Sequence, residues 1–252
     1  MFVQEIYALI DRSASMLGKE TDTIEGINKT FEILRQNKNS ETKINISVKL
    51  FNHEELILFQ SIDVENVKKI EYHEFISTGF TALLDAIGNT IKYLIERKNQ
   101  YNNSIIYIMT DGYENSSKYF TYNEIKNLIK EAENYNIKLL YLGANQDAIL
   151  EAKKYGIPYQ QAMNYSENKT SINSALTACA NFSKRMYSNN DVYFTDFERK
   201  SSFQYRSISS PPFIKKDINN SKNYNGYSLL KYILRNECQK SFFDKFILNR
   251  LK

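Results

Sequence analysis

Acid and hydroxyl side chains follow two apolar runs of this sequence, and a threonine precedes a third apolar segment. "IYALIDRSAS" carries Asp11, Ser13 and Ser15 directly after its apolar run. "SIIYIMTDG" ends near Asp111, and "STGFTALLDA" places Thr81 just ahead of a helical pattern. All of these side chains present oxygen, which hard cations such as Mg²⁺ and Mn²⁺ prefer. The residue types therefore indicate a divalent-cation site, if the fold brings the three segments together.

The spacing within the first segment supports this interpretation. In an extended turn, alternate side chains of Asp-X-Ser-X-Ser project the same way. The ligand set is small, so Mg²⁺ or Mn²⁺, which keep bound waters, suit it better than Ca²⁺. Both histidines, His53 and His73, stand next to glutamates in polar stretches, and we expect them on the surface. Without a Ser-His pair or another activated nucleophile, the pattern favours binding over catalysis, and we predict that the chain is not an enzyme.

The surrounding pattern predicts an α/β fold. Continuous apolar runs at 6–10, 104–109 and 137–143 are typical of strands buried on both faces of a parallel sheet. Segment 44–51 alternates apolar and polar residues, and 56–60 follows closely enough to form a hairpin. Helical spacing recurs between these runs, over 24–34, 83–95, 121–132, 146–156 and 171–186. Ligands bind at the carboxyl ends of the strands in such sheets, where the three polar segments would meet.

Composition limits the possible classes of protein. Hydrophobic residues make up 42% of the 252 residues and charged residues 25%, which is ordinary for a globular chain. The net charge is +4, yet residues 191–252 contain twelve Lys or Arg against six Asp or Glu. The excess of positive charge thus lies in this segment and not in the body of the protein. We therefore expect no nucleic-acid binding by the body, which leaves only the C-terminal segment as a candidate. The sequence shows neither a signal-peptide pattern nor an apolar run long enough to cross a membrane, and its two cysteines are too few for a disulfide framework. We predict an intracellular, cytoplasmic protein.

The character of the chain changes near residue 187. We predict one domain over 1–187, and over 188–252 a polar linker with Pro211 and Pro212 followed by a basic amphipathic extension. The extension could contact a membrane, bind a partner helix or pack back onto the body. The sequence leaves these three readings open.

Three motifs together resemble a known family. "DRSAS" at 11–15, "GFTALLDAI" at 79–87 and "IMTDG" at 108–112 are similar to the three parts of the metal-ion-dependent adhesion site (MIDAS) of von Willebrand factor A (VWA) domains. "YLGANQDA" at 141–148 resembles the intracellular VWA proteins of bacteria and phages more than integrins. The resemblance covers roughly 1–187 and implies a Rossmann-like, doubly wound, mostly parallel sheet with an antiparallel edge strand.

The resemblance also implies a function and a ligand set. Residue by residue, it maps the metal site onto Asp11, Ser13, Ser15, Thr81 and Asp111. In the family the serines, and in one state the threonine, touch Mg²⁺ or Mn²⁺ directly, while the aspartates often act through water. The remaining ligand is an Asp or Glu of a partner protein. The resemblance therefore implies a metal-dependent protein-binding module, such as an intracellular scaffold or assembly factor.

Other residues near the motifs have more than one reading. Tyr113, Glu114 and Tyr119 could form a rim that contacts the partner, or an ordinary connection. Asn145 could belong to the same rim or cap the helix that follows. Asp85 is expected one turn into its helix, where it would orient neighbouring loops.

Two alternative functions stay open. The first is a Mg²⁺-dependent phosphohydrolase, although haloacid-dehalogenase-like enzymes need a second acid two residues after the first, where this chain has Ser13. The second is a structural protein with an inactive metal site.

Overall fold

A six-stranded sheet forms the centre of the protein. The computed structural model describes residues 1–144, 147–188 and 192–203. The strand order is β3-β2-β1-β4-β5-β6, and every pairing is parallel except that of β3 with β2 at one edge. The strands are β1 (Phe2–Asp11), β2 (Thr42–Phe51), β3 (Glu55–Asp63), β4 (Asn103–Thr110), β5 (Ile137–Gly143) and β6 (Ala162–Asn164). The predicted sheet, with its antiparallel edge strand, is confirmed.

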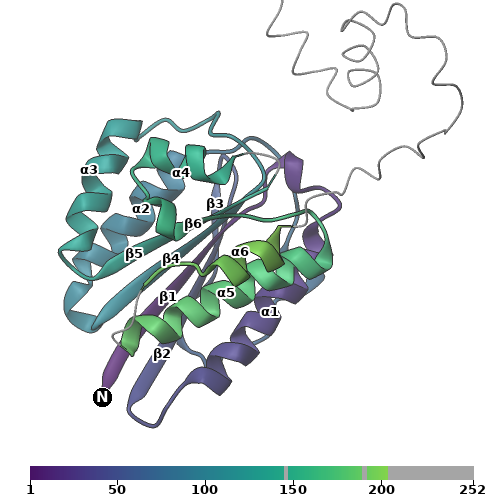
Figure 1. Cartoon of the computed structure of the whole chain (residues 1–252). Coiled ribbons are helices and arrows are strands. Elements are labelled where there is room, and N and C mark those ends of the chain that lie inside the picture. The colour runs from purple at the N-terminus through teal and green to yellow at the C-terminus, as the bar shows by residue number, and fades with distance from the viewer. Residues whose placement is uncertain (145–146, 189–191, 204–252) are drawn as a thin grey trace, which may run out of the picture. The chain divides into compact units, whose positions relative to one another are not determined.

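Helices cover both faces of this sheet (Figure 1). They are α1 (Glu20–Asn37), α2 (Leu83–Glu96), α3 (Tyr122–Glu133), α4 (Ala148–Tyr155), α5 (Lys169–Tyr187) and α6 (Asp196–Ser202). Buried side chains of α1 and α5 pack on one face, and those of α2, α3 and α4 pack on the other. This is the doubly wound arrangement, in which loops after the parallel strands converge at one edge.

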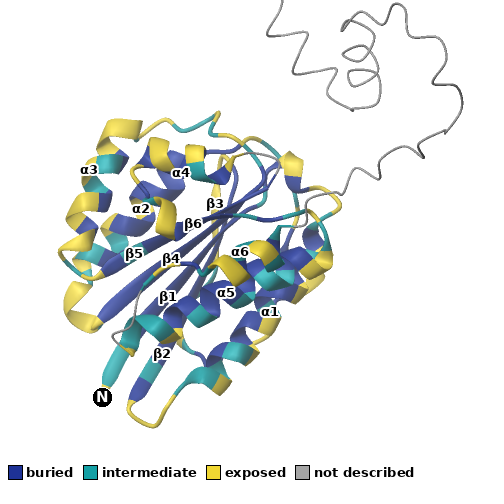
Figure 2. Ribbon diagram, viewed as in Figure 1, coloured by how far each residue is buried: buried dark blue, intermediate teal, exposed yellow. Residues whose placement is uncertain are grey.

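The alternation of side chains along β1 divides the core into two layers. Ile6, Ala8 and Ile10 join the layer beneath α1 and α5, whereas Tyr7 and Leu9 join the layer beneath α2 and α3. Figure 2 shows the inner strands buried, with exposed residues on the outer sides of the helices. Each fully buried Ile or Leu side chain contributes about 1.5–3 kcal/mol to the stability of the fold. The continuous apolar run of β1 therefore reflects burial on both faces.

Most element predictions agree with the structure. The predicted strands correspond to β1 to β5 and the predicted helices to α1 to α5. Helix α3 begins as expected, because the Thr121 side chain accepts a hydrogen bond from the Glu124 amide and the Glu124 carboxylate accepts one from the Thr121 amide. The sequence pattern does not reveal β6, which has only three residues, or α6.

Part of the predicted extension packs on the domain. Phe194 is buried beside Phe182 of α5, and Glu198 of α6 forms an ion pair with Arg185 of α5. The predicted amphipathic segment near the C-terminus lies outside the described residues, and the boundary at 187 stays a prediction.

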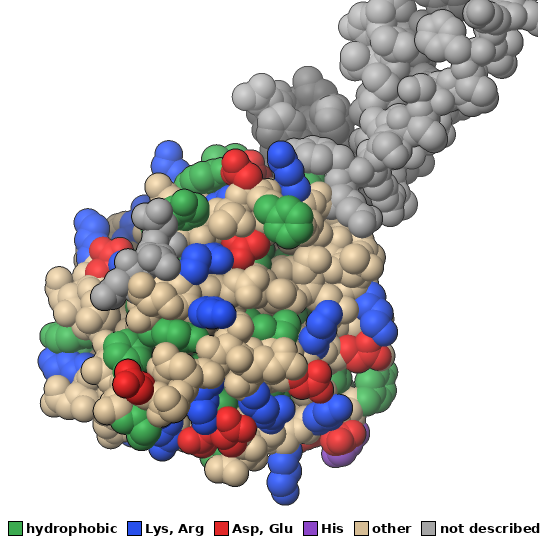
Figure 3. Space-filling view, turned by 60° about the horizontal axis from the view of Figure 1, so that its bottom comes forward, with side chains coloured by type: hydrophobic (Ala, Val, Ile, Leu, Met, Phe, Trp, Pro, Cys, Tyr) green, Lys and Arg blue, Asp and Glu red, His purple; other side chains and the backbone are tan. Residues whose placement is uncertain are grey.

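On the face shown in Figure 3, basic side chains are interspersed with acidic ones, so this face presents no extended basic field. In the part of the chain that the structure describes, every helix is too short or too polar to cross a lipid bilayer. Cys179 is a buried, free thiol.

Candidate metal site

The three sequence segments meet at the carboxyl edge of the sheet. Asp11 is the last residue of β1, Asp111 follows β4, and Thr81 precedes α2. An ideal Cβ built on Gly112 would lie 3.0 Å from Thr81 Oγ1, 3.3 Å from Ser15 Oγ and 3.5 Å from Asp11 Oδ2. Oxygen atoms of two segments therefore face Gly112 of the third, in a small space that a side chain at 112 would fill.

Hydrogen bonds connect these oxygen atoms further. Ser13 Oγ and Ser15 Oγ lie 3.0 Å apart, and Ser15 Oγ donates to Asp111 Oδ1 at 2.5 Å. Asp11, Ser13, Thr81 and Asp111 are all buried, whereas Ser15 is exposed. The structure thus brings the five predicted residues together, with access from solvent at Ser15.

Asp11 organises the loop that follows β1. Its Oδ1 accepts a 2.7 Å hydrogen bond from the amide of Ser13, and its Oδ2 accepts a 2.6 Å bond from Thr110 Oγ1. Met16, at the end of the short 3₁₀ turn after Ser13, is fully buried and anchors the loop. Burial raises the pKa of Asp11 to about 6, and the bonds from Thr110 and Ser13 only partly offset this rise.

Backbone hydrogen bonds fix the loop that carries Thr81. Thr78 N donates to Arg12 O at 2.9 Å, and Ala14 N donates to Gly79 O at 3.0 Å. Gly79 has φ +76°, and a Cβ there would lie 2.2 Å from His53 Nδ1. The positive φ favours glycine, and any larger residue here would be strained and would require the His53 imidazole to move.

The segment 112–120 supports the same loop from the other side. The Thr81 amide donates to Asn115 Oδ1 at 2.9 Å, and the Thr81 carbonyl accepts from the amide of Asn115 at 3.0 Å. Asp85, in the first turn of α2, accepts hydrogen bonds from three successive amides, those of Lys118, Tyr119 and Phe120. The expectation that Asp85 orients a neighbouring loop is confirmed.

The predicted rim residues differ in their surroundings. Tyr113 and Tyr119 are exposed, but the Glu114 carboxylate accepts bonds from the amides of Leu84, Ser116 and Ser117. These contacts favour a role in holding the loop. Asn145 lies outside the described residues; the N-cap of α4 is Asp147, whose side chain accepts from two helix amides.

Lys19 was not predicted at this site. Its ammonium contacts both Asp111 Oδ2 and Glu167 Oε1. Desolvation by itself would lower the pKa of Lys19, but the hydrogen bonds to the two carboxylates raise it above its usual value. Glu167 is 148 positions further along the chain, so no local pattern could have revealed the contact.

Two exposed apolar side chains beside the site were also missed. Leu17 and Phe80 are 73% and 67% exposed, and they stand two residues after Ser15 and one before Thr81. The sequence did contain a signal for them, because each is an apolar residue in an otherwise polar loop. Both histidines are exposed, as expected.

The donor set fits a hard divalent cation. Three hydroxyls and two carboxylates present oxygen only. The space beside Gly112 faces oxygen atoms of Thr81, Ser15 and Asp11, and Ser15 in turn contacts Ser13 and Asp111. Among the described residues, no group of three or more His, Cys, Asp or Glu side chains is placed to hold a metal, so a cation here would depend on the hydroxyls. Neutral ligands leave such a cation with positive charge to attract another anion.

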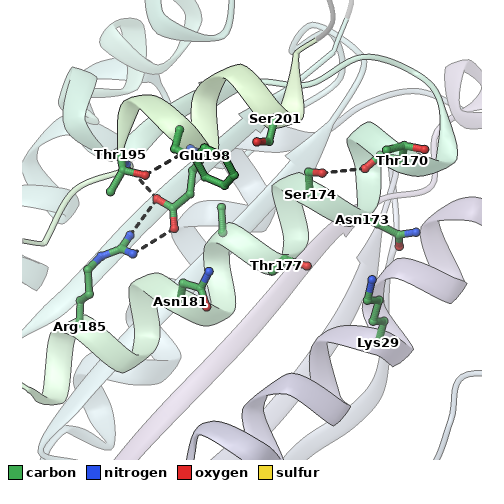
Figure 4. Close-up of a pocket in the computed structure, with 12 residues that line it drawn as sticks. Lys29, Thr170, Asn173, Ser174, Thr177, Asn181, Arg185, Thr195, Glu198 and Ser201 are labelled. Carbon is green, nitrogen blue, oxygen red and sulfur yellow. Dashed lines mark hydrogen bonds and ion pairs between the residues drawn. The ribbon is translucent and has the colours of Figure 1, made fainter.

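A separate groove of about 580 Å³ lies between α1, α5 and α6. In Figure 4, Arg185 and Glu198 face each other across it, with Lys29 and Asn173 at the opposite end. Two hydrogen bonds join Arg185 to Glu198, so these charges are paired. None of the five candidate metal residues lines this groove.

Comparison with known proteins agrees with this fold. The family profile described as von Willebrand factor type A domain matches residues 5–158. This chain therefore belongs to the von Willebrand factor type A domain family. No curated protein matches it in sequence.

Solved structures share the fold at low sequence identity. A von Willebrand factor type A protein from Catenulispora acidiphila has a TM-score of 0.54 at 12% identity, over 73% of this chain and 43% of that one. Proximal thread matrix protein 1 from the mussel byssus, solved with a zinc-occupied MIDAS motif, has a TM-score of 0.53 at 13% identity, over 73% and 46%. The pilus adhesin SpaC of Lactobacillus rhamnosus GG has a TM-score of 0.57 at 10% identity, over 73% and 31%. This chain thus spans less than half the length of each.

Proposed function

We propose that this protein is a divalent-metal-dependent protein-binding module and not an enzyme. The observation that carries the proposal is the meeting of five oxygen-bearing side chains at the carboxyl edge of the sheet, three of them facing Gly112 and the other two in contact with Ser15. Ser13, Ser15 and Thr81 would hold Mg²⁺ or Mn²⁺, and Asp11 and Asp111 would balance its charge. The bound metal supplies a positive centre that attracts one more anionic oxygen.

The partner, in this proposal, presents an Asp or Glu side chain to that metal. Exposed Leu17, Phe80 and Tyr113 adjoin the metal residues in the sequence, and they give the surrounding surface apolar character. A partner that covers such side chains gains roughly 1.5–3 kcal/mol for each one fully buried. We therefore expect the preferred carboxylate to be flanked by apolar residues.

The contacts of the hydroxyls support binding over catalysis. Ser13 and Ser15 contact each other, and Ser15 donates to a carboxylate, so neither is paired with an imidazole that would activate it. Solved proteins that share the fold include a byssus matrix protein and a pilus adhesin. The intracellular location stays a prediction.

An array of peptides tests the proposal. Peptides with a single Asp, Glu, Asn or Gln, flanked by apolar or polar residues, are probed with the full chain in Mg²⁺ and in EDTA. We expect capture only by the acidic peptides, stronger with apolar flanks, and lost in EDTA. Asp11→Asn should abolish it, while the control Asp22→Asn, in the first turn of α1, should not.

Two outcomes would overturn the proposal. Capture that is equal in Mg²⁺ and EDTA would show that binding does not use the metal. Mg²⁺-dependent turnover of p-nitrophenyl phosphate, lost in Asp11→Asn, would instead favour the phosphohydrolase alternative.

A further inference from the structure

A lysine ammonium stands beside one of the two candidate metal carboxylates. Lys19 immediately precedes α1, and its ammonium contacts Oδ2 of Asp111. Oδ1 of the same carboxylate accepts the hydrogen bond from Ser15. The Asp111 side chain has no exposed surface, so this is an enclosed ion pair rather than a pair between two solvated groups. Lys19 therefore neutralises charge inside the proposed metal site.

The same ammonium has a second carboxylate within reach. Glu167 lies between β6 and α5 and contacts Lys19 from outside the five candidate metal residues. The side chain of Lys19 is 20% exposed and that of Glu167 is 28% exposed, so this second contact is nearer to solvent. The ammonium could thus move away from Asp111 and still keep one anionic partner, Glu167.

A divalent cation held next to Asp111 would be close to this ammonium. Like charges repel strongly where burial reduces screening by water. A cation and the ammonium would also compete for the same carboxylate, since Ser15 already uses its other oxygen. Close binding of the metal at Asp111 therefore favours a position of Lys19 nearer to Glu167.

We propose that Lys19 is an intramolecular competitor of the divalent cation for Asp111, and that Glu167 receives the ammonium when the metal binds. This proposal rests on the metal site of the proposed function and describes its regulation. It makes Lys19 and Glu167 positioning residues, which set the metal affinity without being ligands.

The competition would couple the metal to a second part of the molecule. Next to Glu167, the Ser166 amide donates a 3.0 Å hydrogen bond to the carbonyl of Ser202, at the end of α6. Tyr165, one residue earlier, is buried and donates its amide to the Gly143 carbonyl at the end of β5. A change in how closely Lys19 contacts Glu167 would therefore act on a segment that is hydrogen-bonded to both β5 and α6.

Four forms of the full chain test this proposal: wild type, Lys19→Gln, Glu167→Gln and the double variant. Mg²⁺ and Mn²⁺ affinities are measured by calorimetry, and melting temperatures are measured in EDTA. Lys38→Gln is the matched control, because Lys38 is at the other end of α1 and forms an ion pair with Glu65. It removes the same charge about 28 Å away along the helix.

We expect Lys19→Gln to strengthen metal binding but to destabilise the metal-free protein. Without the competing ammonium, metal affinity rises by about three- to tenfold. Without its counter-ion, the buried Asp111 lowers the melting temperature in EDTA by about 2–4 °C. Glu167→Gln should weaken metal binding by about threefold, because the displaced ammonium loses its acceptor. In the Lys19→Gln background, Glu167→Gln should change the affinity little.

Each other outcome has a definite meaning. If the wild type binds metal and Lys19→Gln binds it equally or more weakly, the competitor proposal is wrong while the metal site stands. If only Lys19→Gln binds metal, Lys19 blocks the site in the wild type, and the proposed function is wrong although the competition is real. If neither binds metal, both proposals are wrong.

Discussion

Thr110 Oγ1 donates a 2.6 Å hydrogen bond to Asp11 Oδ2 and so joins the ends of β1 and β4 at the candidate metal site. The two strands are neighbours in the centre of the sheet, and both residues are fully buried. The bond leaves the Asp11 carboxylate with a fixed orientation relative to Asp111. We consider it the link by which the sheet positions the site.

Replacement of Thr110 tests that link. Thr110→Val removes the donor, so we expect a loss of stability of about 1–2 kcal/mol and metal binding weakened by about three- to tenfold. Thr110→Ser keeps the hydroxyl and should bind metal within about twofold of wild type. Calorimetry on both variants decides the matter. Equal metal affinity in Thr110→Val and wild type would contradict this role.

The space beside Gly112 gives a second prediction. Gly112→Ala would place a methyl group 3.0 Å from Thr81 Oγ1 and 3.3 Å from Ser15 Oγ, where the cation would bind. Gly112 is not among the glycines with positive φ, so the backbone accepts alanine without that strain. We expect at least about a tenfold loss of Mg²⁺ affinity, with circular dichroism unchanged. Retained affinity would place the cation elsewhere.

Buried Asp85 gives a prediction about the supporting loop. Asp85→Asn replaces one of two acceptor oxygens by a donor, and three amides depend on them. We expect a loss of about 2 kcal/mol of stability and faster hydrogen exchange at the amides of 118–120. Asp22→Asn, also in the first turn of a helix, controls for the helix dipole. Unchanged exchange at 118–120 would show that the loop does not depend on Asp85.

Glu5 predicts a pH dependence that is independent of the metal. Burial raises its pKa to about 7, despite hydrogen bonds from Ser47 at 2.6 Å and Ser61 at 2.9 Å. The folded protein therefore holds this proton more tightly than the unfolded chain. Stability should fall as pH rises from about 4.5 to about 7, by up to about 3 kcal/mol from this group.

Urea unfolding at pH 5 and pH 8 in EDTA tests whether stability falls as the pH rises. Glu5→Gln should reduce the loss of stability between these two pH values, leaving the smaller contribution of Asp11, whose pKa is raised to about 6 by burial. An unchanged difference between pH 5 and pH 8 would contradict the assignment to Glu5.

Much of this fold could be predicted because buried faces of strands and helices produce regular patterns of apolar residues in the sequence. The apolar run of β1 reports burial on both faces, and Ile44, Ile46, Val48 and Leu50 of β2 report the face beneath α1 and α5. The polar residues between them, Asn45, Ser47 and Lys49, are buried too, which the alternation did not indicate. The three-residue β6 produces no such pattern, since "AMN" is too short to show a period. The short α6 was missed for a different reason, because its polar surroundings resemble a linker.

The candidate site was predictable to the extent that its chemistry is local. Asp11, Ser13 and Ser15 form one motif, and Asp111 and Thr81 follow from the ends of elements. The contact between Lys19 and Glu167 joins distant segments, and only the folded chain shows it. The inward position of Glu114 was hidden for the same reason, because the sequence does not show which way a loop side chain points.

Crystals of the full chain grown with Mn²⁺ test the central claim most directly, through the anomalous scattering of the metal. We predict one strong peak beside Gly112, bonded to Ser13 Oγ and Ser15 Oγ, which is absent in crystals of Gly112→Ala. A peak that lies away from these oxygen atoms, or no peak at saturating Mn²⁺, would contradict the assignment of the metal site.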